Sequence, residues 1–396
     1  MRVNDSLPSP AVSAFHPVPQ SVRYKRLRVS IVSDAIVGRN GVGTYYEDLM
    51  EHLRDRVDHI SLIAPTLERR SRLERFSVPM PGDTTQGMIW PRIGALYRML
   101  DQQSPNLMII PSLGACSYFG LRYAKANNIP IVVADHTKFD RLASLYWPDI
   151  ISGPLASVLR KLHRWLIHQA SMIASLNSDA YEDAKALGAR SIRIMGTPVA
   201  AEFLRKPSTP RREQISRVIF VGRLAIEKGL DQILAAAKTH SQIEFAIAGD
   251  GPGRALVENA ASTVTNIQYL GWLSRERVLQ ELDRSEALLL PSAFESFGTV
   301  ALEALARKRY VLVRPDCGIA KWPSLAGGLF YINEDESVAE TLERLMAIPI
   351  EARDGIARRS WDAVHDFNQH TISRWLGFLA DAMDSHSDAH STSQAA

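Results

Sequence analysis

Short apolar runs alternate with longer amphipathic stretches along most of this chain. Continuous apolar runs of this length are typical of parallel strands that helices cover on both faces of a sheet. In the first half we expect six such strands: Leu27–Val32, Ile60–Ile63, Leu107–Ile110, Ile129–Val133, Met172–Leu176 and Ile192–Met195.

The second half repeats the alternation. Two successive strand-helix series predict the α/β class, with two doubly wound, Rossmann-like domains. Ligands of such sheets bind at the carboxyl ends of the strands, so we expect the two domains to face a central cleft. The strands expected in the second half are Val218–Val221, Phe245–Ala248, Ile267–Leu270, Ala287–Leu290 and Tyr310–Val313.

Composition and periodicity also predict the domain boundaries. Four prolines interrupt the first 24 residues, and a stretch rich in Pro, Ser and Thr follows residue 205. The expected order is a flexible leader at 1–24, a first domain at 25–204, a linker at 205–212, a second domain at 213–365, a helix at 366–383 that packs back against the first domain, and a disordered tail at 384–396.

The composition indicates a globular protein. The chain has 396 residues, of which 46% are hydrophobic and 22% charged, enough for two full cores. Only Cys116 and Cys317 occur, which excludes a disulfide framework and fits a reducing cytoplasm. The sequence contains no run of about 18 apolar residues, so we expect no membrane-spanning segment.

Charge is uneven. Residues 1–200 hold 24 Lys and Arg against 17 Asp and Glu, whereas residues 201–396 hold 22 against 26. A basic half can attract an anionic membrane or a nucleic acid, but it is equally consistent with solvated faces that bind nothing specific.

The stretch from Leu290 to Leu305 carries the clearest chemical signal. Glu295 and Glu303 stand eight positions apart around the turn Ser296-Phe297-Gly298, and a helix is expected to begin at Thr299. Amides at a helix N-terminus attract an anion. Eight helical residues span about 12 Å, so the two carboxylates could hold opposite ends of a ligand with an anion in its middle. A nucleotide-sugar diphosphate has this layout.

Two further strand ends carry candidate phosphate groups. Gly222 and Arg223 follow one expected strand, with Lys228 five residues beyond the arginine, and these two cations could neutralise a diphosphate without a metal ion. Gly249 opens a Gly-Asp-Gly-Pro turn whose glycines permit close approach of the backbone.

The first half offers a glycine loop and a histidine. The loop that includes Gly41 and Gly43 has neither the Gly-x-Gly-x-x-Gly order nor a P-loop pattern, so hydride transfer and ATP hydrolysis lose support. Its amides suit a distal phosphate or a leaving group. His136 follows an expected strand between acidic and basic neighbours, where a site residue and an ordinary surface residue are both consistent.

The chain resembles the family 4 retaining glycosyltransferases of GT-B fold from about Leu27 to Met383. The motifs that carry the resemblance occur in order: Val221-Gly-Arg-Leu followed by Glu227-Lys-Gly, Gly249-Asp-Gly-Pro, Tyr269-Leu-Gly-Trp272, and the two spaced glutamates. His136-Thr-Lys-Phe-Asp and Ser144-Leu-Tyr are most similar to members that glycosylate membrane lipids.

The resemblance implies that Arg223 and Lys228 hold the diphosphate, Glu303 binds the ribose, and Glu295 holds the donor sugar beside His136. Because two cations and a helix terminus are expected to face the diphosphate and no Asp-x-Asp pair is available to hold a metal ion, we expect a reaction that needs neither a metal ion nor a cofactor. The residues assigned to catalysis are His136, Arg223, Lys228 and Glu295. Those assigned to donor binding are Gly41, Gly43, Gly222, Gly249, Gly271, Trp272, Ser296, Phe297, Gly298, Thr299 and Glu303.

The sequence departs from the family pattern in three places. A paired glycine is usual where Asn40-Gly41 stands, which changes the geometry expected of that loop's amides. Pro198 in Gly196-Thr-Pro198 removes a donor, so donor or acceptor selectivity could differ, and Lys308-Arg309 replaces small and apolar residues. The expected reaction is retaining transfer of a hexose from a UDP- or GDP-sugar to a lipid, lipid-linked or polysaccharide acceptor. A nucleotide-sugar epimerase, a phosphorylase-like enzyme and a sugar-nucleotide sensor without activity remain alternatives.

A peripheral contact with the inner face of an anionic membrane is also expected, and a nucleic-acid partner is not. Basic and aromatic residues interleave in Leu73–Leu100 and in Leu159–Ile167. The same apolar residues could instead be the core faces of ordinary helices.

Overall fold

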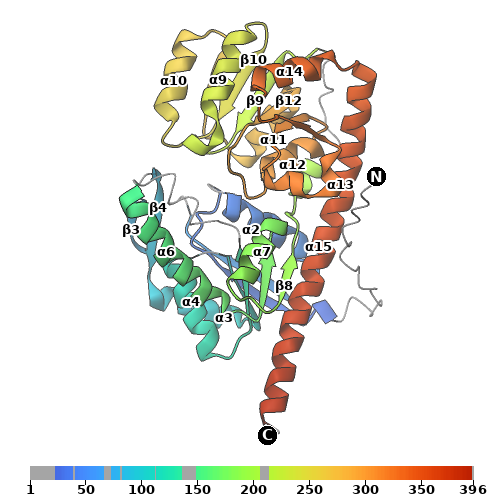
Figure 1. The fold of residues 1–396 in the computed structure, drawn as a ribbon. Coiled ribbons are helices and arrows are strands. Elements are labelled where there is room, and N and C mark those ends of the chain that lie inside the picture. The colour runs from blue at the N-terminus through green and yellow to red at the C-terminus, as the bar shows by residue number, and fades with distance from the viewer. Residues whose placement is uncertain are drawn as a thin grey trace, which may run out of the picture.

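The computed structural model describes residues 23–38, 41–66, 73–80, 83–111, 113–135, 149–205 and 214–394. Two α/β domains lie one above the other, and a long C-terminal helix runs along both of them (Figure 1). Each domain holds a six-stranded sheet. The predicted architecture of two doubly wound domains is therefore confirmed.

The first sheet has the strand order β2-β1-β5-β6-β7-β8, and all of its neighbouring strands are parallel. Its strands are β1 (Arg28–Val32), β2 (His59–Ile63), β5 (Leu107–Ile110), β6 (Ile131–Asp135), β7 (Met172–Ser175) and β8 (Ile192–Ile194). The helices of this domain are α2 (Gly41–Leu53), α3 (Ile93–Gln103), α4 (Ala115–Ala126), α6 (Asp149–Ile167), α7 (Ser178–Ala186) and α8 (Ala201–Leu204).

The second sheet has the order β11-β10-β9-β12-β13-β14, again entirely parallel. Its strands are β9 (Arg217–Val221), β10 (Glu244–Ala248), β11 (Ile267–Gly271), β12 (Ala287–Leu290), β13 (Tyr310–Val313) and β14 (Leu329–Tyr331). The helices are η1 (Ile226–Lys228), α9 (Leu230–Thr239), α10 (Arg254–Thr263), α11 (Arg275–Arg284), α12 (Thr299–Ala306), η2 (Gly318–Lys321), α13 (Pro323–Ala326) and α14 (Val338–Ala347).

Both sheets are apolar at their centres, as the strand pattern predicts. Every residue of β5, β7, β12 and β13 is buried. Side chains buried on both faces require covering helices, which explains why continuous apolar runs specify this layered fold. Local signals begin several of the helices: Ser274 caps α11, and Ser337 forms a capping box with Glu340 at α14.

Three strands were not expected. β3 (Glu74–Met80) and β4 (Asp83–Pro91) form an antiparallel hairpin beside the first sheet, and β14 extends the second sheet at its edge. Pro79 and Gly87 lie inside the hairpin strands, and both residue types weaken the usual signal for a strand.

The C-terminal helix α15 runs from Ile350 to Gln394 and joins the two domains. Trp375 is fully buried, and its Nε1 donates a hydrogen bond to the hydroxyl of Tyr45 in α2 at 2.9 Å. That hydroxyl in turn donates to the carbonyl of Gly196 at 2.9 Å. A Cβ on Gly196 would lie 2.1 Å from Oγ1 of Thr371, so the glycine permits the helix to pack closely there.

Two of the predicted boundaries are wrong at this helix. α15 continues without a break across the expected boundary between residues 365 and 366, and residues 384–394 are helical rather than disordered. Asp384 pairs with Arg23 and Arg26 at the other end of the described chain, and these ion pairs hold the helix where composition alone predicts disorder. Residues 1–22 and most of the expected linker lie outside the described residues.

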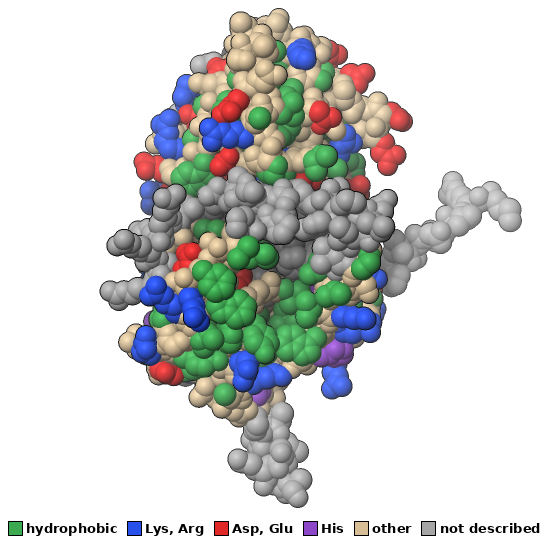
Figure 2. Space-filling model, turned by 90° about the vertical axis from the view of Figure 1, so that its left-hand side faces the viewer, with side chains coloured by type: hydrophobic (Ala, Val, Ile, Leu, Met, Phe, Trp, Pro, Cys, Tyr) green, Lys and Arg blue, Asp and Glu red, His purple; other side chains and the backbone are tan. Residues whose placement is uncertain are grey.

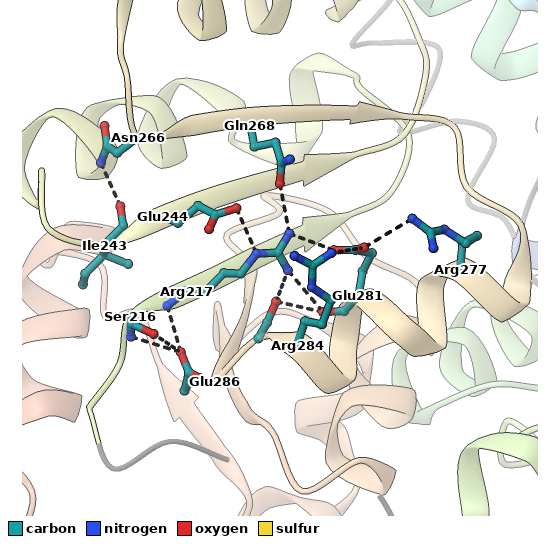
Figure 3. A network of polar contacts seen from close by, with 11 residues as sticks. Ser216, Arg217, Ile243, Glu244, Asn266, Gln268, Arg277, Glu281, Arg284 and Glu286 are labelled. Carbon is teal, nitrogen blue, oxygen red and sulfur yellow. Dashed lines mark hydrogen bonds and ion pairs between the residues drawn. The ribbon is translucent and has the colours of Figure 1, made fainter. Parts of the chain in front are cut away.

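A charged network centred on the buried Arg217 joins the amino-terminal ends of neighbouring strands in the second sheet (Figure 3). Arg217 at the start of β9 donates to Glu244 of β10 at 3.0 Å and to Glu281 of α11 at 2.7 Å. It also donates to Gln268 of β11 at 3.2 Å and to the hydroxyl of Ser285 at 3.0 Å. Because a buried guanidinium needs partners for its donors, this network ties three strands and a helix together.

Candidate active site

Three predicted glycines lie side by side at the carboxyl ends of adjacent strands. Gly222 follows β9, Gly249 follows β10, and Gly271 ends β11. The amide of Gly249 donates to the carbonyl of Gly271 at 2.8 Å. Gly249 has a φ of +144°, and a Cβ on it would lie 1.8 Å from the carbonyl oxygen of Gly222. A side chain cannot be accommodated there, so the strand ends present backbone rather than side chains at this position.

Trp272 directly follows Gly271 at the end of β11 and is 47% exposed. Gly271 before it has a φ of +66°, in the left-handed region, and so turns the chain at the end of β11. The indole ring is therefore available to a planar group of a ligand, and its assignment to donor binding remains a prediction.

The two predicted cations stand after β9 and are already paired with carboxylates. Arg223 donates to Glu227, which is buried. Lys228 Nζ lies 2.5 Å from Oε2 of Glu295 and donates a hydrogen bond to it. The structure thus brings Lys228 and Glu295, 67 residues apart in sequence, into contact at the strand ends.

The loop after β12 is held against η1. The carbonyl of Glu227 accepts a hydrogen bond from the amide of Ala293 at 2.8 Å. Gly229 has a φ of +66°, and a Cβ on it would lie 2.7 Å from the carbonyl oxygen of Pro291. Because this contact requires a glycine, the motif Glu227-Lys228-Gly229 has a packing reason in addition to any role toward a ligand.

The turn before α12 presents backbone rather than side chains. Gly298 caps the helix in the left-handed region with a φ of +89°, and Thr299 is the first helical residue. The ring of Phe297 is 3% exposed and stacks on Phe367 of α15 at 6.1 Å. The assignment of Phe297 to donor binding can therefore apply only to its backbone.

Glu303, assigned to the ribose, pairs with a residue that the sequence analysis did not single out. Arg275 at the start of α11 donates to Oε1 of Glu303 at 2.6 Å. The same guanidinium donates to both oxygens of Asp48 in α2, at 3.0 and 2.9 Å. Arg275 therefore links the two domains through two nearly buried carboxylates.

The electrostatics of this three-residue group, Asp48, Arg275 and Glu303, are dominated by burial. Burial raises the pKa of Asp48 to about 8, against the opposing effect of Arg275, and the charge of Glu303 adds to the rise. Burial also raises the pKa of Glu303, again against Arg275. One arginine thus faces two carboxylates, and burial favours keeping a proton on this group.

A pocket of about 370 Å³ opens beside this group, between α2, α8 and α11. Its polar lining is mainly acidic. The lining residues are Glu47, Asp48, Glu51, Ala200, Glu202, Arg205 and Arg275. Within the described parts of the chain, no cluster of His, Cys, Asp or Glu side chains has the arrangement to hold a metal ion.

Two further hydrogen bonds close the domains onto each other. Asn177, which follows β7 and caps α7, donates through Nδ2 to the carbonyl of Ser296 at 2.8 Å. Trp322 Nε1 donates to the carbonyl of Leu176 at 3.2 Å. The residues after β7 of the first sheet thus contact two segments of the second domain, the loop after β12 and the residue between η2 and α13.

The remaining predicted residues belong to the first domain. Gly41 begins α2 with open space where a Cβ would point, and Gly43 lies buried two residues later. Strand β6 ends at Asp135, and His136 lies outside the described residues. Asp48, Asn177 and Arg275 were missed because each acts through a partner more than a hundred residues away.

The chain matches two protein families on either side of the domain boundary. Residues 39–203 match Glycosyltransferase Family 4, and residues 203–360 match Glycosyl transferases group 1. A GDP-mannose-dependent alpha-(1-6)-phosphatidylinositol dimannoside mannosyltransferase from Mycobacterium tuberculosis is 24% identical over 283 residues, which cover 67% of this chain and 72% of that protein.

Solved structures share the fold over nearly the whole chain. Sucrose-phosphate synthase from Thermosynechococcus elongatus has a TM-score of 0.69 at 17% identity, covering 90% of this chain and 99% of that one. HepE from Anabaena, in complex with UDP and glucose, has a TM-score of 0.61 at 15% identity, covering 89% and 100%. With adjoining family matches over residues 39–360 and this shared architecture, the chain belongs to the group 1, family 4 glycosyltransferases of GT-B fold.

Proposed function

We propose that this glycosyltransferase moves a hexose from a UDP- or GDP-sugar to a lipid or lipid-linked acceptor, with retention at the anomeric carbon. The observation that carries the proposal is the contact between Lys228 and Glu295 beside the N-terminus of α12. The cation and the helix amides suit a phosphate, and the carboxylate suits sugar hydroxyls. Together at one point they suit a sugar that carries a phosphate.

Departure of the diphosphate would leave negative charge beside Arg223 and Lys228. Both cations now contact carboxylates, and a phosphate can take over those hydrogen bonds because it offers the same kind of acceptor. Charge that grows in the transition state is stabilised by donors that are already in place. The same residues make a resident metal ion unnecessary for holding the diphosphate.

The acceptor hydroxyl would attack from the face that the diphosphate leaves, and its proton would pass to the departing phosphate oxygen. Glu295 then positions the sugar rather than forming a covalent bond, because its carboxylate is held by Lys228 on the phosphate side. His136 is proposed to lie beside the sugar. Glu303 is proposed to accept hydrogen bonds from the ribose hydroxyls.

The names of similar proteins support the proposed classes of donor and acceptor. The mycobacterial relative is described as dependent on GDP-mannose and as acting on a phosphatidylinositol dimannoside, and the structurally similar HepE binds UDP and glucose. These names support a nucleoside diphosphate sugar, and the first of them supports a lipid acceptor.

The test is a screen of radiolabelled UDP-, GDP- and ADP-sugars against a membrane lipid extract. We expect one UDP- or GDP-sugar to label a lipid, with free nucleoside diphosphate released in equal amount. The anomeric configuration of the product, read by NMR, should equal that of the donor. Inversion would contradict the proposed mechanism.

The same screen separates the alternatives. An epimerase converts the donor without releasing nucleoside diphosphate, and a sensor binds the donor without converting it. Tight binding of a nucleotide sugar with no turnover on lipid, glycan or polysaccharide extracts would favour the sensor and overturn the enzymatic proposal.

A further inference from the structure

Five aromatic rings form a continuous chain on the outer surface of the first domain. Phe76 of β3 stacks on Trp90 of β4 at 6.2 Å, and Trp90 meets Phe119 of α4 edge to face at 5.8 Å. Phe119 lies 5.3 Å from Tyr118, which lies 6.2 Å from Trp165 of α6. Three separate elements, the hairpin, α4 and α6, thus contribute to one surface, here called the aromatic face.

This surface is exposed rather than part of the core. Trp90 is 42% exposed, Trp165 40% and Leu162 46%. Figure 2 shows hydrophobic side chains gathered over this side of the first domain, with Lys and Arg side chains around them. A contiguous exposed apolar patch that is rimmed by polar residues is typical of an interaction site.

Helix α6 has apolar residues on two sides. Leu166 and Ile167 are buried against the sheet, whereas Val158, Leu162 and Trp165 form an outward stripe at a spacing of four and three residues. The interpretation of Leu159–Ile167 as only the core face of a helix is therefore wrong for this stripe. The stripe continues the aromatic face through the contact of Trp165 with Tyr118.

Positive charge borders the aromatic face. At about 100° per residue, Lys161 and Arg164 lie along one side of the outward stripe of α6. The sequence of α4 contains Arg122 and Lys125 but no acidic residue, and α6 contains one acid, at its first residue Asp149. Arg122, Lys161 and Arg164 are all exposed.

We propose that the aromatic face docks on the surface of an anionic lipid bilayer. Trp and Tyr favour the boundary between headgroups and acyl chains, Leu and Val add apolar contact below it, and neighbouring Lys and Arg attract anionic headgroups. The elements of the aromatic face carry six Lys and Arg, against the three acids Glu74, Asp83 and Asp149. A protein partner would also cover apolar area, but this excess of positive charge favours an anionic surface over one of mixed charge. The proposal deepens the proposed function and rests on it for the acceptor, since it assigns the surface through which the enzyme reaches a lipid.

The experiment is sedimentation of the full chain, without donor, with vesicles of phosphatidylcholine alone or with phosphatidylglycerol added. The parent should bind the anionic vesicles at low ionic strength and leave them as salt is added. Leu162→Glu should weaken this binding by about tenfold or more, because it places a charge in the apolar stripe. Leu256→Glu is the matched control: Leu256 on α10 of the second domain is 50% exposed, against 46% for Leu162.

A double substitution, Lys161→Glu with Arg164→Glu, should abolish the preference for anionic over neutral vesicles. The unfolding temperatures of all variants should equal that of the parent, because each changed residue is exposed. Nucleotide binding should also be unchanged, because none of these residues lies at the proposed donor site. Equal losses in Leu162→Glu and Leu256→Glu, or a parent that ignores anionic vesicles, would overturn the proposal. So would binding that requires membrane proteins and fails with pure lipid, which would indicate a protein partner.

The two proposals fail separately. Vesicle binding by the aromatic face together with no transfer to any lipid would leave the docking surface standing and remove the lipid acceptor. Transfer to a detergent-dispersed lipid that Leu162→Glu leaves unchanged, together with no vesicle binding by the parent, would do the reverse.

Discussion

Lys228 and Glu295 contact each other across the candidate active site, with Nζ 2.5 Å from Oε2. Each side chain is partly exposed, 15% and 19%, so a ligand can reach both. The ion pair compensates the charge of the lysine with a carboxylate at the position where the donor diphosphate is proposed to bind. Binding would then replace a carboxylate around the lysine by a phosphate rather than expose an uncompensated charge.

Lys228→Ala should lower kcat/KM by at least about tenfold, or 1.4 kcal/mol, because the lysine opposes charge that grows on the leaving diphosphate. Arg223→Ala should have an effect of similar size. Lys238→Ala, an exposed lysine of α9, is the control. Steady-state kinetics with the identified donor measure the effect, and near-parental values for both variants would mean that the diphosphate is held elsewhere.

The two glutamates should be separable. Glu303→Ala is expected to weaken nucleoside diphosphate binding by about 1–3 kcal/mol through loss of a charged hydrogen bond, whereas Glu295→Ala should mainly lower kcat. Calorimetry with UDP and GDP measures the first effect and single-turnover kinetics the second. Parental affinity in Glu303→Ala would refute the ribose assignment.

Arg275→Ala should destabilise the closed arrangement of the domains. It removes the shared partner of Asp48 and Glu303 and leaves two neighbouring carboxylates nearly buried. Since the arginine is partly exposed, we expect a loss of about 1–3 kcal/mol, less than for a fully buried pair. Arg277→Ala, on the same helix and more exposed, should cost little in thermal or urea unfolding. Equal losses in the two variants would show that the link between the domains contributes nothing.

Stability should fall as the pH rises toward 8. Burial raises the pKa of Asp48 to about 8, far above its unfolded value of about 4. The folded state therefore binds a proton that the unfolded state has lost, and this contribution, fully present below pH 4, is lost as the pH rises through the folded pKa. Asp48→Asn should flatten the dependence of the unfolding temperature on pH between about pH 4 and pH 8, where the folded and unfolded states differ in bound protons. An unchanged slope in that variant would assign the dependence to other groups.

Turnover should survive removal of divalent metal ions. Two cations and the N-terminus of α12 are proposed to face the diphosphate. These groups would hold the diphosphate without the help of a metal ion. Activity in EDTA should therefore remain within about twofold of the untreated enzyme, a difference near 0.4 kcal/mol. Activity that vanishes with EDTA and returns with Mn²⁺ would contradict this expectation.

None of the helices in the described part of the chain combines the length and the apolar character that crossing a bilayer requires.

Local pattern was sufficient for much of the second domain. β12 and β13 begin and end where the apolar runs do. A strand that is buried on both faces is apolar at every position, so its first and last residues can be recognised from the sequence. The glycines at 222, 249 and 271 were also identifiable, because each directly follows or ends an apolar run. Of the three, only Gly271 is explained by a local left-handed turn, whereas Gly249 is required by its close approach to the carbonyl of Gly222. The hairpin of β3 and β4 was not predicted, because Pro79 and Gly87 interrupt it and because most of its apolar side chains, such as Phe76 and Met88, are exposed.

The sequence by itself determined the class of fold, the order of the strands along the chain and the chemical types at each strand end, all of which depend on residues a few positions apart. Only the tertiary structure decided which of these residues meet. Arg275 pairs with Asp48 at a separation of 227 residues, and Arg23 with Asp384 at 361. No sequence pattern around a charged residue identifies such a partner, because the same local sequence would also fit a charge that is solvated by water. The partner of a charged residue depends on how the two domains and α15 pack, which is a property of the whole chain.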